Sequence, residues 1–506
     1  MRRTQLLAGV AVMLTTATPA AAETLREALV KAYNTNPTLA AQRANVRATD
    51  ENVPIAKSAA LPSVSLTGGY TENLVSASNS FVSPDRQATA SSTLSVPIYA
   101  GGGTRNSIRA AETRVEAGRF SLRGTESDLF TAVVGAYMDV IRDEAIVSLN
   151  EQNVKVLDVN LQASKDRFQV GDLTRTDVAQ SDARLAVARS QLQSAQARLI
   201  SSRESYIRLV GSAPGTLEVP PALPNLPADP DNAVAVAIDN NPALLAAQKN
   251  RDASGFDIGV ARSNRLPKLS VNIGGNYYNY LGSLGSGTGV AVGQTGTSAT
   301  AGLGLTVPLF QGGRPAAQIR QAQERRAQAA EQVTETERSV IAQARSAYAV
   351  WKSSLEVIAS SEVAVNANKL SLEGVRAENS VGNRTILDIL NAEQELLNSQ
   401  VTLVTARRDA YVAGFALLAA MGAAEAKDLG LDGGPLYDPV ANYKRVRGKI
   451  WDYGSQPDPV ETGTSTARTP AQGSVVTRPL DPILDAPPVE PAVDTGAANP
   501  AGGVKK

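Results

Sequence analysis

The chain has 506 residues and a formal net charge of zero, because 49 Lys and Arg balance 49 Asp and Glu. It contains no Cys and no His, which excludes disulfides, thiolate nucleophiles, Ser-His-Asp triads and metal sites built on imidazole or thiolate. The balanced charge also gives no electrostatic footprint for nucleic acid. We therefore expect neither an enzyme nor a nucleic-acid-binding protein, and no cofactor, metal or catalytic residue.

The first 22 residues predict an export signal. A basic start, Met1-Arg2-Arg3, precedes a mostly apolar run over 5–18 and then Ala20-Ala21-Ala22, which fits a small-x-small cleavage site. We expect residues 1–22 to be a signal peptide; a buried N-terminal helix is the disfavoured alternative. No later segment reaches the roughly 18–20 apolar residues of a spanning helix. An exported chain of this kind is periplasmic, secreted or an outer-membrane β-barrel.

The sequence then repeats itself. Asn36-Pro37 recurs 205 residues later as Asn241-Pro242. Val-Pro-Ile-Tyr-Ala-Gly-Gly at 96–102 recurs 211 residues later as Val-Pro-Leu-Phe-Gln-Gly-Gly at 307–313, and this second offset persists to the end of the repeat. Regular offsets of this kind indicate internal duplication. We predict repeat 1 at 23–211, a Pro-rich linker at 212–229 and repeat 2 at 230–422.

Each repeat begins with a predicted helix and two strands. In the first copy, residues 24–58 have helical spacing, and Leu61-Pro62 ends the helix. Two alternating stretches of about 10 residues follow, the length of a tilted membrane-spanning strand. Their apolar positions are Val64, Leu66 and Tyr70, then Leu94, Val96 and Ile98; in the second copy they are Leu269, Val271 and Ile273, then Leu303, Leu305, Val307 and Leu309.

Two long helices complete each repeat. Residues 103–169 and 315–380 contain almost no helix breaker, and a helix over the first range would be about 100 Å long at 1.5 Å per residue. In the return segments a seven-residue repeat predicts close-packed coiled-coil hairpins. Its members are Val178, Leu185, Leu192, Leu199 and Tyr206 in one copy, and Ile389, Leu396, Leu403, Ala410 and Leu417 in the other.

Four strands cannot close a barrel alone, and an open sheet edge in lipid leaves backbone groups unpaired. Two copies would give eight strands, whose interior is filled by side chains, and three would give twelve, enough for a lumen. We therefore expect an oligomer whose helices extend the ring of strands as a cylinder.

This organisation resembles the TolC family of outer-membrane channel-tunnels. The resemblance spans residues 23–422 and is carried by the motifs at 96–102 and 307–313 and by the tip segments 170–178 and 381–390. It implies an α+β membrane protein in the Gram-negative outer membrane: a homotrimer with a 12-stranded β-barrel, four strands per chain, continued into the periplasm by an α-helical barrel of coiled-coil hairpins.

The resemblance also implies a passive duct that is gated at the helix tips. Such a duct would pass cargo from an inner-membrane transporter, either an ABC or a proton-driven type, and a periplasmic adaptor protein to the outside. The cargo would be secreted protein, small molecules or both, and the sequence does not distinguish them. A periplasmic coiled-coil scaffold is the alternative. An enzyme using paired carboxylates is disfavoured, because nothing places two acids in one pocket.

By the same resemblance, Asp388 contributes to an acidic ring at the pore constriction. Arg384 matches an arginine that latches to an aspartate of the first-repeat tip, which is Asp177 here. The sequence departs from the family at Asn391, often a second aspartate, and at Asn379, a tyrosine of the latch. Simple N-capping of the return helices by Asp177 and Asp388 is the alternative role.

Glycines mark the expected turns. Gly171 and Gly382 predict the hairpin-tip turns. Where strands pass into helices, the backbone angles that only glycine adopts freely are expected at Gly101, Gly102, Gly312 and Gly313.

The C-terminal part lies outside the repeats. Residues 423–454 hold the aromatic cluster of Tyr437, Tyr443, Trp451 and Tyr453, and we expect this equatorial-type segment to pack against the middle of the cylinder. Residues 455–506 are rich in Pro, Ala, Thr and Asp, which predicts a disordered tail.

Overall fold

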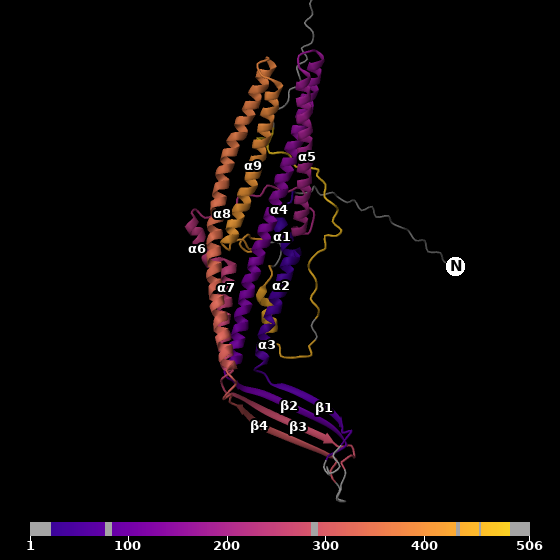
Figure 1. The fold of residues 1–506 in the computed structure, drawn as a ribbon, viewed down its shortest axis with the longest axis vertical. Helices are drawn as coiled ribbons and strands as arrows, with labels where there is room; N and C mark the ends of the chain where they lie inside the picture. Colours follow the sequence, from indigo (N-terminus) through magenta and orange to yellow (C-terminus); the bar gives the residue numbers. More distant parts are fainter. Residues whose placement is uncertain (1–21, 76–82, 285–291, 432–435, 455–456, 486–506) are drawn as a thin grey trace, which may run out of the picture.

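The computed structural model of the chain describes residues 22–75, 83–284, 292–431, 436–454 and 457–485. The predicted signal peptide therefore lies outside the described residues, apart from its last position. The molecule is long and narrow, with two helical hairpin tips at one end and a β-sheet at the other (Figure 1).

The sheet has four antiparallel strands, as the sequence predicted. In chain order and in space these are β1 (Ser63–Glu72), β2 (Arg86–Ala100), β3 (Lys268–Asn279) and β4 (Thr295–Thr306). Pairing of β2 with β3 joins the two repeats. The register aligns apolar residues in rows across one face, such as Val96, Val271 and Leu303, whereas the opposite face carries polar rows such as Ser95 and Asn272.

Four long helices form the two hairpins, and they match the predicted helices closely. They are α4 (Gly103–Gln169), α5 (Arg175–Val210), α8 (Arg314–Ser380) and α9 (Ile386–Ala420). Helices α4 and α8 each have 67 residues. The heptad positions of the return helices face inward: Leu185, Leu199 and Tyr206 are buried on α5, and all five of the second copy are buried on α9. The predicted coiled-coil packing is therefore present in both hairpins.

The predicted single helix over 24–58 is wrong, because the chain breaks twice there. It forms α1 (Leu25–Thr35), α2 (Pro37–Asp50) and α3 (Asn52–Ser58). At Asn36 the backbone is extended, as is favoured before proline, and the side chain accepts a hydrogen bond from the Thr38 amide to cap α2.

The second repeat breaks at the same motif, between α6 (Pro230–Asn240) and α7 (Pro242–Ser263). The two asparagines also have matching partners. The Asn36 side chain donates to the Leu209 carbonyl at 2.9 Å, and the Asn241 side chain donates to the Ala420 carbonyl at 2.9 Å. Each repeated Asn-Pro motif therefore fastens a short helix to the end of the return helix of its own repeat.

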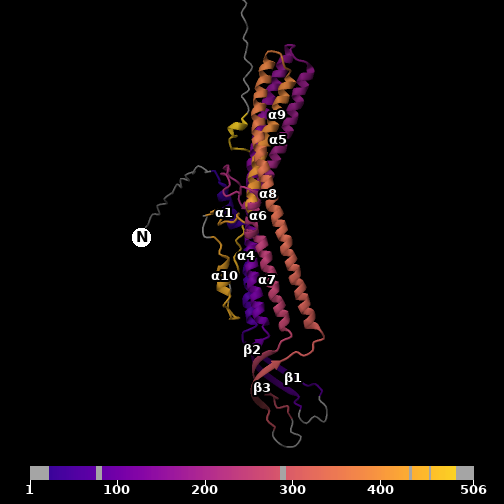
Figure 2. The same cartoon turned by 90° about the vertical axis from the view of Figure 1, so that its left-hand side faces the viewer.

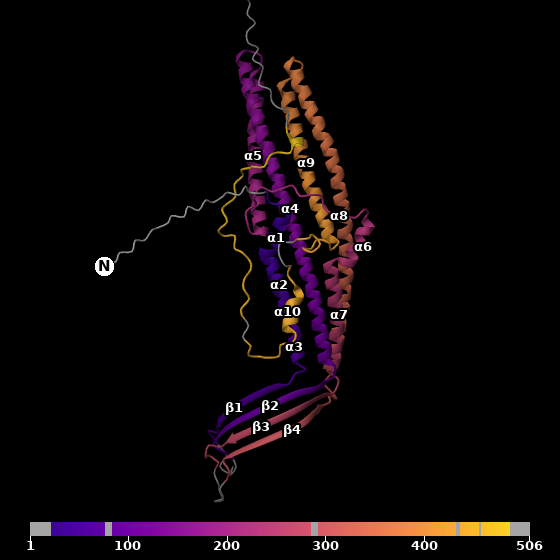
Figure 3. The ribbon, with the colours of Figure 1, turned by 180° about the vertical axis from the view of Figure 1, so that it is seen from behind.

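The C-terminal part corrects two predictions. Helix α10 (Pro439–Val446) packs on α2 and α3, with Tyr443 half-buried beside Val53. Tyr437 also packs against the helical core, as expected. The prediction is wrong for Trp451 and Tyr453, which are 77% and 88% exposed. The chain after α10 leaves the helices and runs along the outside of the molecule (Figure 3).

The expected disorder of 455–506 is also wrong for residues 457–485, which we call the strap. It climbs along the outside of the helices towards the hairpin tips (Figure 1) and ends in a short 3-10 helix, η1 (Pro482–Leu484). Leu484 is only 3% exposed, because it inserts into the apolar cluster around Leu397 and Val404 of α9. Residues 455–456 and 486–506 lie outside the described part of the chain.

Candidate functional site

The hairpin tips are built in the same way in both repeats. After α4 the chain turns at Gly171, whose φ is +90°, and after α8 at Gly382, whose φ is +83°. In each turn an amide reaches back to close the helix end: Asp172 N–H donates to the Arg167 carbonyl at 2.9 Å, and Asn383 N–H to the Glu378 carbonyl at 3.0 Å. Such 6→1 bonds need a left-handed residue, which explains the two glycines.

Asp177 and Asp388 occupy equivalent places just beyond these turns. Each lies three residues after a threonine N-cap in a capping box. Oδ2 of Asp388 accepts from Thr385 N–H at 2.9 Å and from its hydroxyl at 2.7 Å, and Asp177 has the same bonds from Thr174. The N-caps are therefore the threonines and not the aspartates. The hydroxyl and amide donors lower the pKa of both carboxyls, so that both stay charged near neutral pH.

The structure does not bring Arg384 to Asp177 within the described part of one chain. The Arg384 guanidinium instead pairs with Glu378 of the same hairpin, with Nε 2.7 Å from Oε2. Asn379, which departs from the resemblance, donates to the Arg384 carbonyl at 2.7 Å and so tightens this same turn.

The other departure, Asn391, connects the two hairpins. Its side-chain oxygen accepts a hydrogen bond of 2.9 Å from Arg184 of α5. Sequence reasoning missed Arg184, because nothing in its helix distinguishes it from other exposed cations. Only its place opposite α9 reveals the partner.

A buried carboxylate that the sequence analysis also missed lies about two turns along α9 from the tip, on the side of the sheet. Glu393 of α9 is 6% exposed and accepts two hydrogen bonds from Asn160 of α4, at 2.9 and 3.1 Å. Arg376 of α8 lies 3.3 Å from its Oε1. Burial raises the pKa of Glu393, and the bonds to Asn160 and Arg376 oppose this shift. The residue therefore joins three helices through a carboxylate that is costly to ionise.

At the other end of the helices, glycines allow the chain to pass from strand to helix. Gly102 and Gly313 are the left-handed N-caps of α4 and α8, with φ of +76° and +79°. Gly101 and Gly312 precede them with φ of +63° and +58°. A Cβ on Gly101 would lie 2.9 Å from the Ser263 carbonyl oxygen, so this position needs glycine for both conformation and space.

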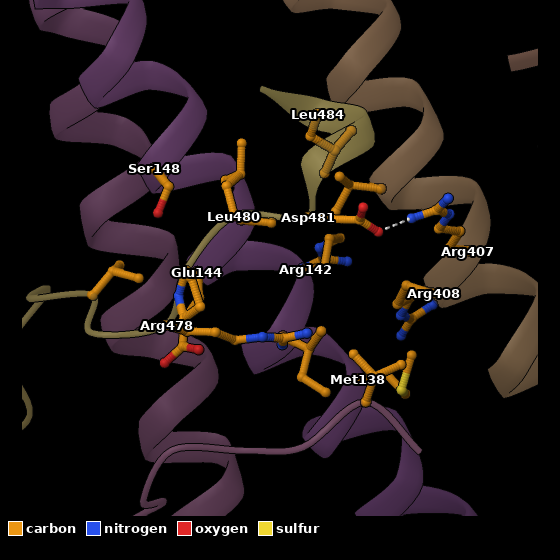
Figure 4. Close-up of a pocket in the computed structure, with 16 residues that line it drawn as sticks. Met138, Arg142, Glu144, Ser148, Arg407, Arg408, Arg478, Leu480, Asp481 and Leu484 are labelled. Carbon is orange, nitrogen blue, oxygen red and sulfur yellow. Dashed lines mark hydrogen bonds and ion pairs between the residues drawn. The ribbon is translucent and has the colours of Figure 1, made fainter. Parts of the chain in front are cut away.

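The strap covers the groove between α4 and α9 and encloses a cavity of about 130 Å³ (Figure 4). Asp481 of the strap accepts from Arg407 of α9 at 2.8 Å, and Gln400 donates to the Leu484 carbonyl. On the other side Arg203 of α5 donates to two strap carbonyls and pairs with Glu144. These bonds hold the strap against the helices on both sides of the groove.

Two further findings bear on the site. No group of His, Cys, Asp and Glu in the part of the chain that the structure describes could hold a metal ion. Among the same residues, none of the helices is apolar enough over a sufficient length to cross a membrane.

Comparison with known proteins points to one family. The family model described as outer membrane efflux protein matches residues 28–212 and 233–423, which correspond to the two repeats. The outer membrane efflux protein BepC of Brucella suis is 36% identical over 430 residues, covering 85% of this chain and 92% of that protein. The outer membrane protein TolC of Vibrio cholerae is 27% identical over 412 residues, covering 81% and 92%.

Solved structures share the fold. The CmeC outer membrane channel of Campylobacter jejuni has a TM-score of 0.70 at 17% identity, covering 84% of this chain and 89% of that one. CusC has a TM-score of 0.67 at 18% identity, covering 79% and 92%. The two matched segments, the BepC relationship and the shared fold together show that this chain belongs to the TolC family of outer membrane efflux proteins.

Proposed function

We propose that three copies of this chain form a passive duct through the Gram-negative outer membrane. The observation that carries this proposal is the sheet with one apolar and one polar face. Its apolar residues are largely exposed, with Leu66 at 80% and Leu303 at 74%, as suits a surface facing lipid. The polar face, with Ser95 and Asn272, would then line water.

The open edges of the sheet support a trimer. Within the described residues, β1 and β4 each pair on one side only. In lipid such edges must be paired, and joining β4 of one copy to β1 of the next closes a ring. Three copies of a four-stranded sheet give twelve strands, which leaves room for a lumen. The hairpins would continue this ring as a helical barrel in the periplasm.

The domain boundaries form part of the same proposal. A signal peptide at 1–22 would direct export, and repeats at 23–211 and 230–422, with their linker at 212–229, would build the duct. Residues 423–454 would form an equatorial-type segment outside it.

The duct does no chemistry, and family membership agrees with a transport protein that is not an enzyme. Energy would come from partners: an inner-membrane ABC or proton-driven transporter joined through a periplasmic adaptor. The cargo is small molecules, secreted proteins or both, because the relatives include both efflux proteins and secretion proteins. One is the efflux protein BepC, and another is the alkaline protease secretion protein AprF of Pseudomonas aeruginosa.

Asp388 is our proposed pore constriction. Three copies around one axis would place three charged carboxylates at the narrowest point, a ring that favours cations. Asp177 and Arg384 are our proposed latch, which requires Arg384 to exchange Glu378 for Asp177. The variant Arg384→Glu should then raise the fraction of open channels in bilayer recordings. Glu378→Ala is the control, since it breaks the observed ion pair and spares the latch. If both variants raise the open fraction equally, the latch proposal is wrong.

The proposed function is tested with purified full-length protein. We expect a detergent-dependent trimer that conducts ions in planar bilayers. A protein that stays soluble without detergent and never conducts would support the scaffold alternative instead. Gene deletion then identifies the cargo: hypersensitivity to drugs indicates efflux, loss of particular secreted proteins indicates secretion, and both together indicate a shared duct.

A further inference from the structure

We propose that residues 444–453, the basic-aromatic segment, bind the headgroups of anionic phospholipids on the periplasmic side of the membrane that the sheet spans. This inference rests on the proposed function, because it needs the sheet to lie in the outer membrane. It concerns a surface outside the two repeats and outside the duct.

The first support is where the segment lies. Val446, at the end of α10, is fully buried, and the Arg447 carbonyl accepts a hydrogen bond from Lys57 in the last turn of α3 at 3.4 Å. Helix α3 ends at Ser58, and β1 begins at Ser63. The segment is therefore held at the level where the chain passes from helices into the sheet. Figures 2 and 3 show the chain leaving α10 at this level.

The second support is exposed apolar surface. Ile450 is 75% exposed, and its neighbours Trp451 and Tyr453 are at least as exposed. The rings of Trp451 and Tyr453 meet edge to face, with their centres 6.1 Å apart. The other tryptophan of the chain, Trp351, instead packs on Tyr348. Clustered exposed apolar side chains mark contact surfaces, and Trp and Tyr concentrate where a membrane meets water. The position of the segment and its residue types therefore both indicate contact with the membrane surface.

The third support is charge. The segment carries four cations, Lys444, Arg445, Arg447 and Lys449, and a single acid, Asp452, in a chain whose total charge is zero. Among the described residues, neither the Lys444 ammonium nor the Lys449 ammonium has a hydrogen-bond or ion-pair partner. The Arg447 guanidinium lies over the Tyr443 ring, with its central carbon 5.8 Å from the ring centre. Clusters of Lys and Arg beside a membrane bind anionic headgroups.

Trp451 can report on this contact in the intact protein. The variant Trp351→Phe leaves Trp451 as the only tryptophan. We would reconstitute this full-length trimer into vesicles of phosphatidylcholine with or without phosphatidylglycerol. With phosphatidylglycerol we expect the Trp451 emission to shift to shorter wavelength. We also expect phosphatidylglycerol brominated near the headgroup end of its acyl chains to quench most of this emission.

Charge variants test the recognition. Arg447→Glu combined with Lys449→Glu should abolish the shift and the quenching. The matched control is Lys155→Glu combined with Lys165→Glu, which makes the same charge change at two exposed positions of α4 near the hairpin tip and should leave both signals intact. Conductance of every variant in bilayers reports whether the trimer folds and inserts.

The outcomes separate this inference from the proposed function. Conducting trimers whose Trp451 is not quenched overturn the lipid site and leave the duct standing. An equal emission shift in vesicles of pure phosphatidylcholine, unaffected by charge reversal, overturns recognition of anionic headgroups. Shielding of Trp451 from acrylamide already in detergent, with no response to lipid, means that another copy of the chain covers the segment. Protein that neither inserts nor conducts overturns the proposed function, and the inference with it.

Discussion

The Arg184 guanidinium on α5 donates a hydrogen bond of 2.9 Å to the Asn391 side-chain oxygen on α9, and so links the two hairpins near their tips. Asn391 is the position where the family often has a second aspartate. The neutral Asn391 side chain thus keeps a contact between the hairpins and carries no charge of its own. Introducing a charge at position 391 tests whether this position faces the conducting path.

We expect Asn391→Asp to increase the cation selectivity of the channel, because it adds a carboxylate three residues beyond Asp388. The measurement is the reversal potential in a KCl gradient. Arg184→Ala combined with Asn391→Asp should increase selectivity further, since it frees the new carboxylate from its cation. Asn398→Asp, one heptad further along α9, is the control. An unchanged reversal potential for Asn391→Asp would show that position 391 does not face the conducting path.

The two capping-box aspartates provide a second matched pair. Asp388→Ala and Asp177→Ala remove the same local hydrogen bonds from a threonine N-cap. If Asp388 lines the constriction, only its loss should lower cation selectivity and relieve block by divalent cations. Single-channel recordings measure both. Equal changes in the two variants would mean that the aspartates act through helix capping alone.

The sequence predicted the long elements well because their ends carry strong local signals. Gly102 and Gly313 start the long helices in a conformation that favours glycine, and Gly171 and Gly382 end them in the same way. The repeated motifs also pointed to the right family. The break at Asn36 was missed because the apolar spacing continues past it, although the repeated Asn-Pro motif was the available signal.

The contacts that join distant elements could not be predicted in this way. Glu393 reads as an ordinary helical glutamate until Asn160, 233 residues earlier, is placed beside it. The strap was misjudged for a related reason. Its composition predicts disorder, but Leu484 finds an apolar groove that exists only once α4 and α9 have packed. In both cases the partner surface forms only on folding.

Glu393 predicts a pH dependence of stability. Because burial raises its pKa above the ordinary value of 4.5, the folded chain binds this proton more tightly than the unfolded chain. The contribution of Glu393 to stability is therefore complete below the pKa of its carboxyl in the unfolded chain. It is lost as pH rises through the pKa of this carboxyl in the folded chain. Glu393→Gln stays neutral and keeps an acceptor for Asn160. We expect it to match the wild type at pH 4 and to unfold at a higher temperature than the wild type at neutral pH.

Thermal unfolding followed by circular dichroism across this pH range checks the Glu393 prediction. Glu395→Gln is the control, because the Glu395 side chain is exposed and lies two residues away. The difference in unfolding temperature between Glu395→Gln and the wild type should not change with pH. If Glu393→Gln is less stable than the wild type at neutral pH, the ion pair with Arg376 outweighs the cost of burial, and the prediction is wrong.

The glycines at the strand-to-helix junctions allow backbone conformation and steric space to be tested apart. Gly101 and Gly312 both have a positive φ, but only Gly101 is crowded: an added Cβ would lie 2.8 Å from Leu266 Cβ, whereas nothing lies within 4 Å at Gly312. Gly312→Ala should cost about 1–2 kcal/mol from the left-handed backbone alone. Gly101→Ala should cost about 1–3 kcal/mol more, because the helix α7 must also shift. The thermal unfolding midpoints of the two variants measure this difference, and equal midpoints would show that the contact between Gly101 and α7 relaxes without cost.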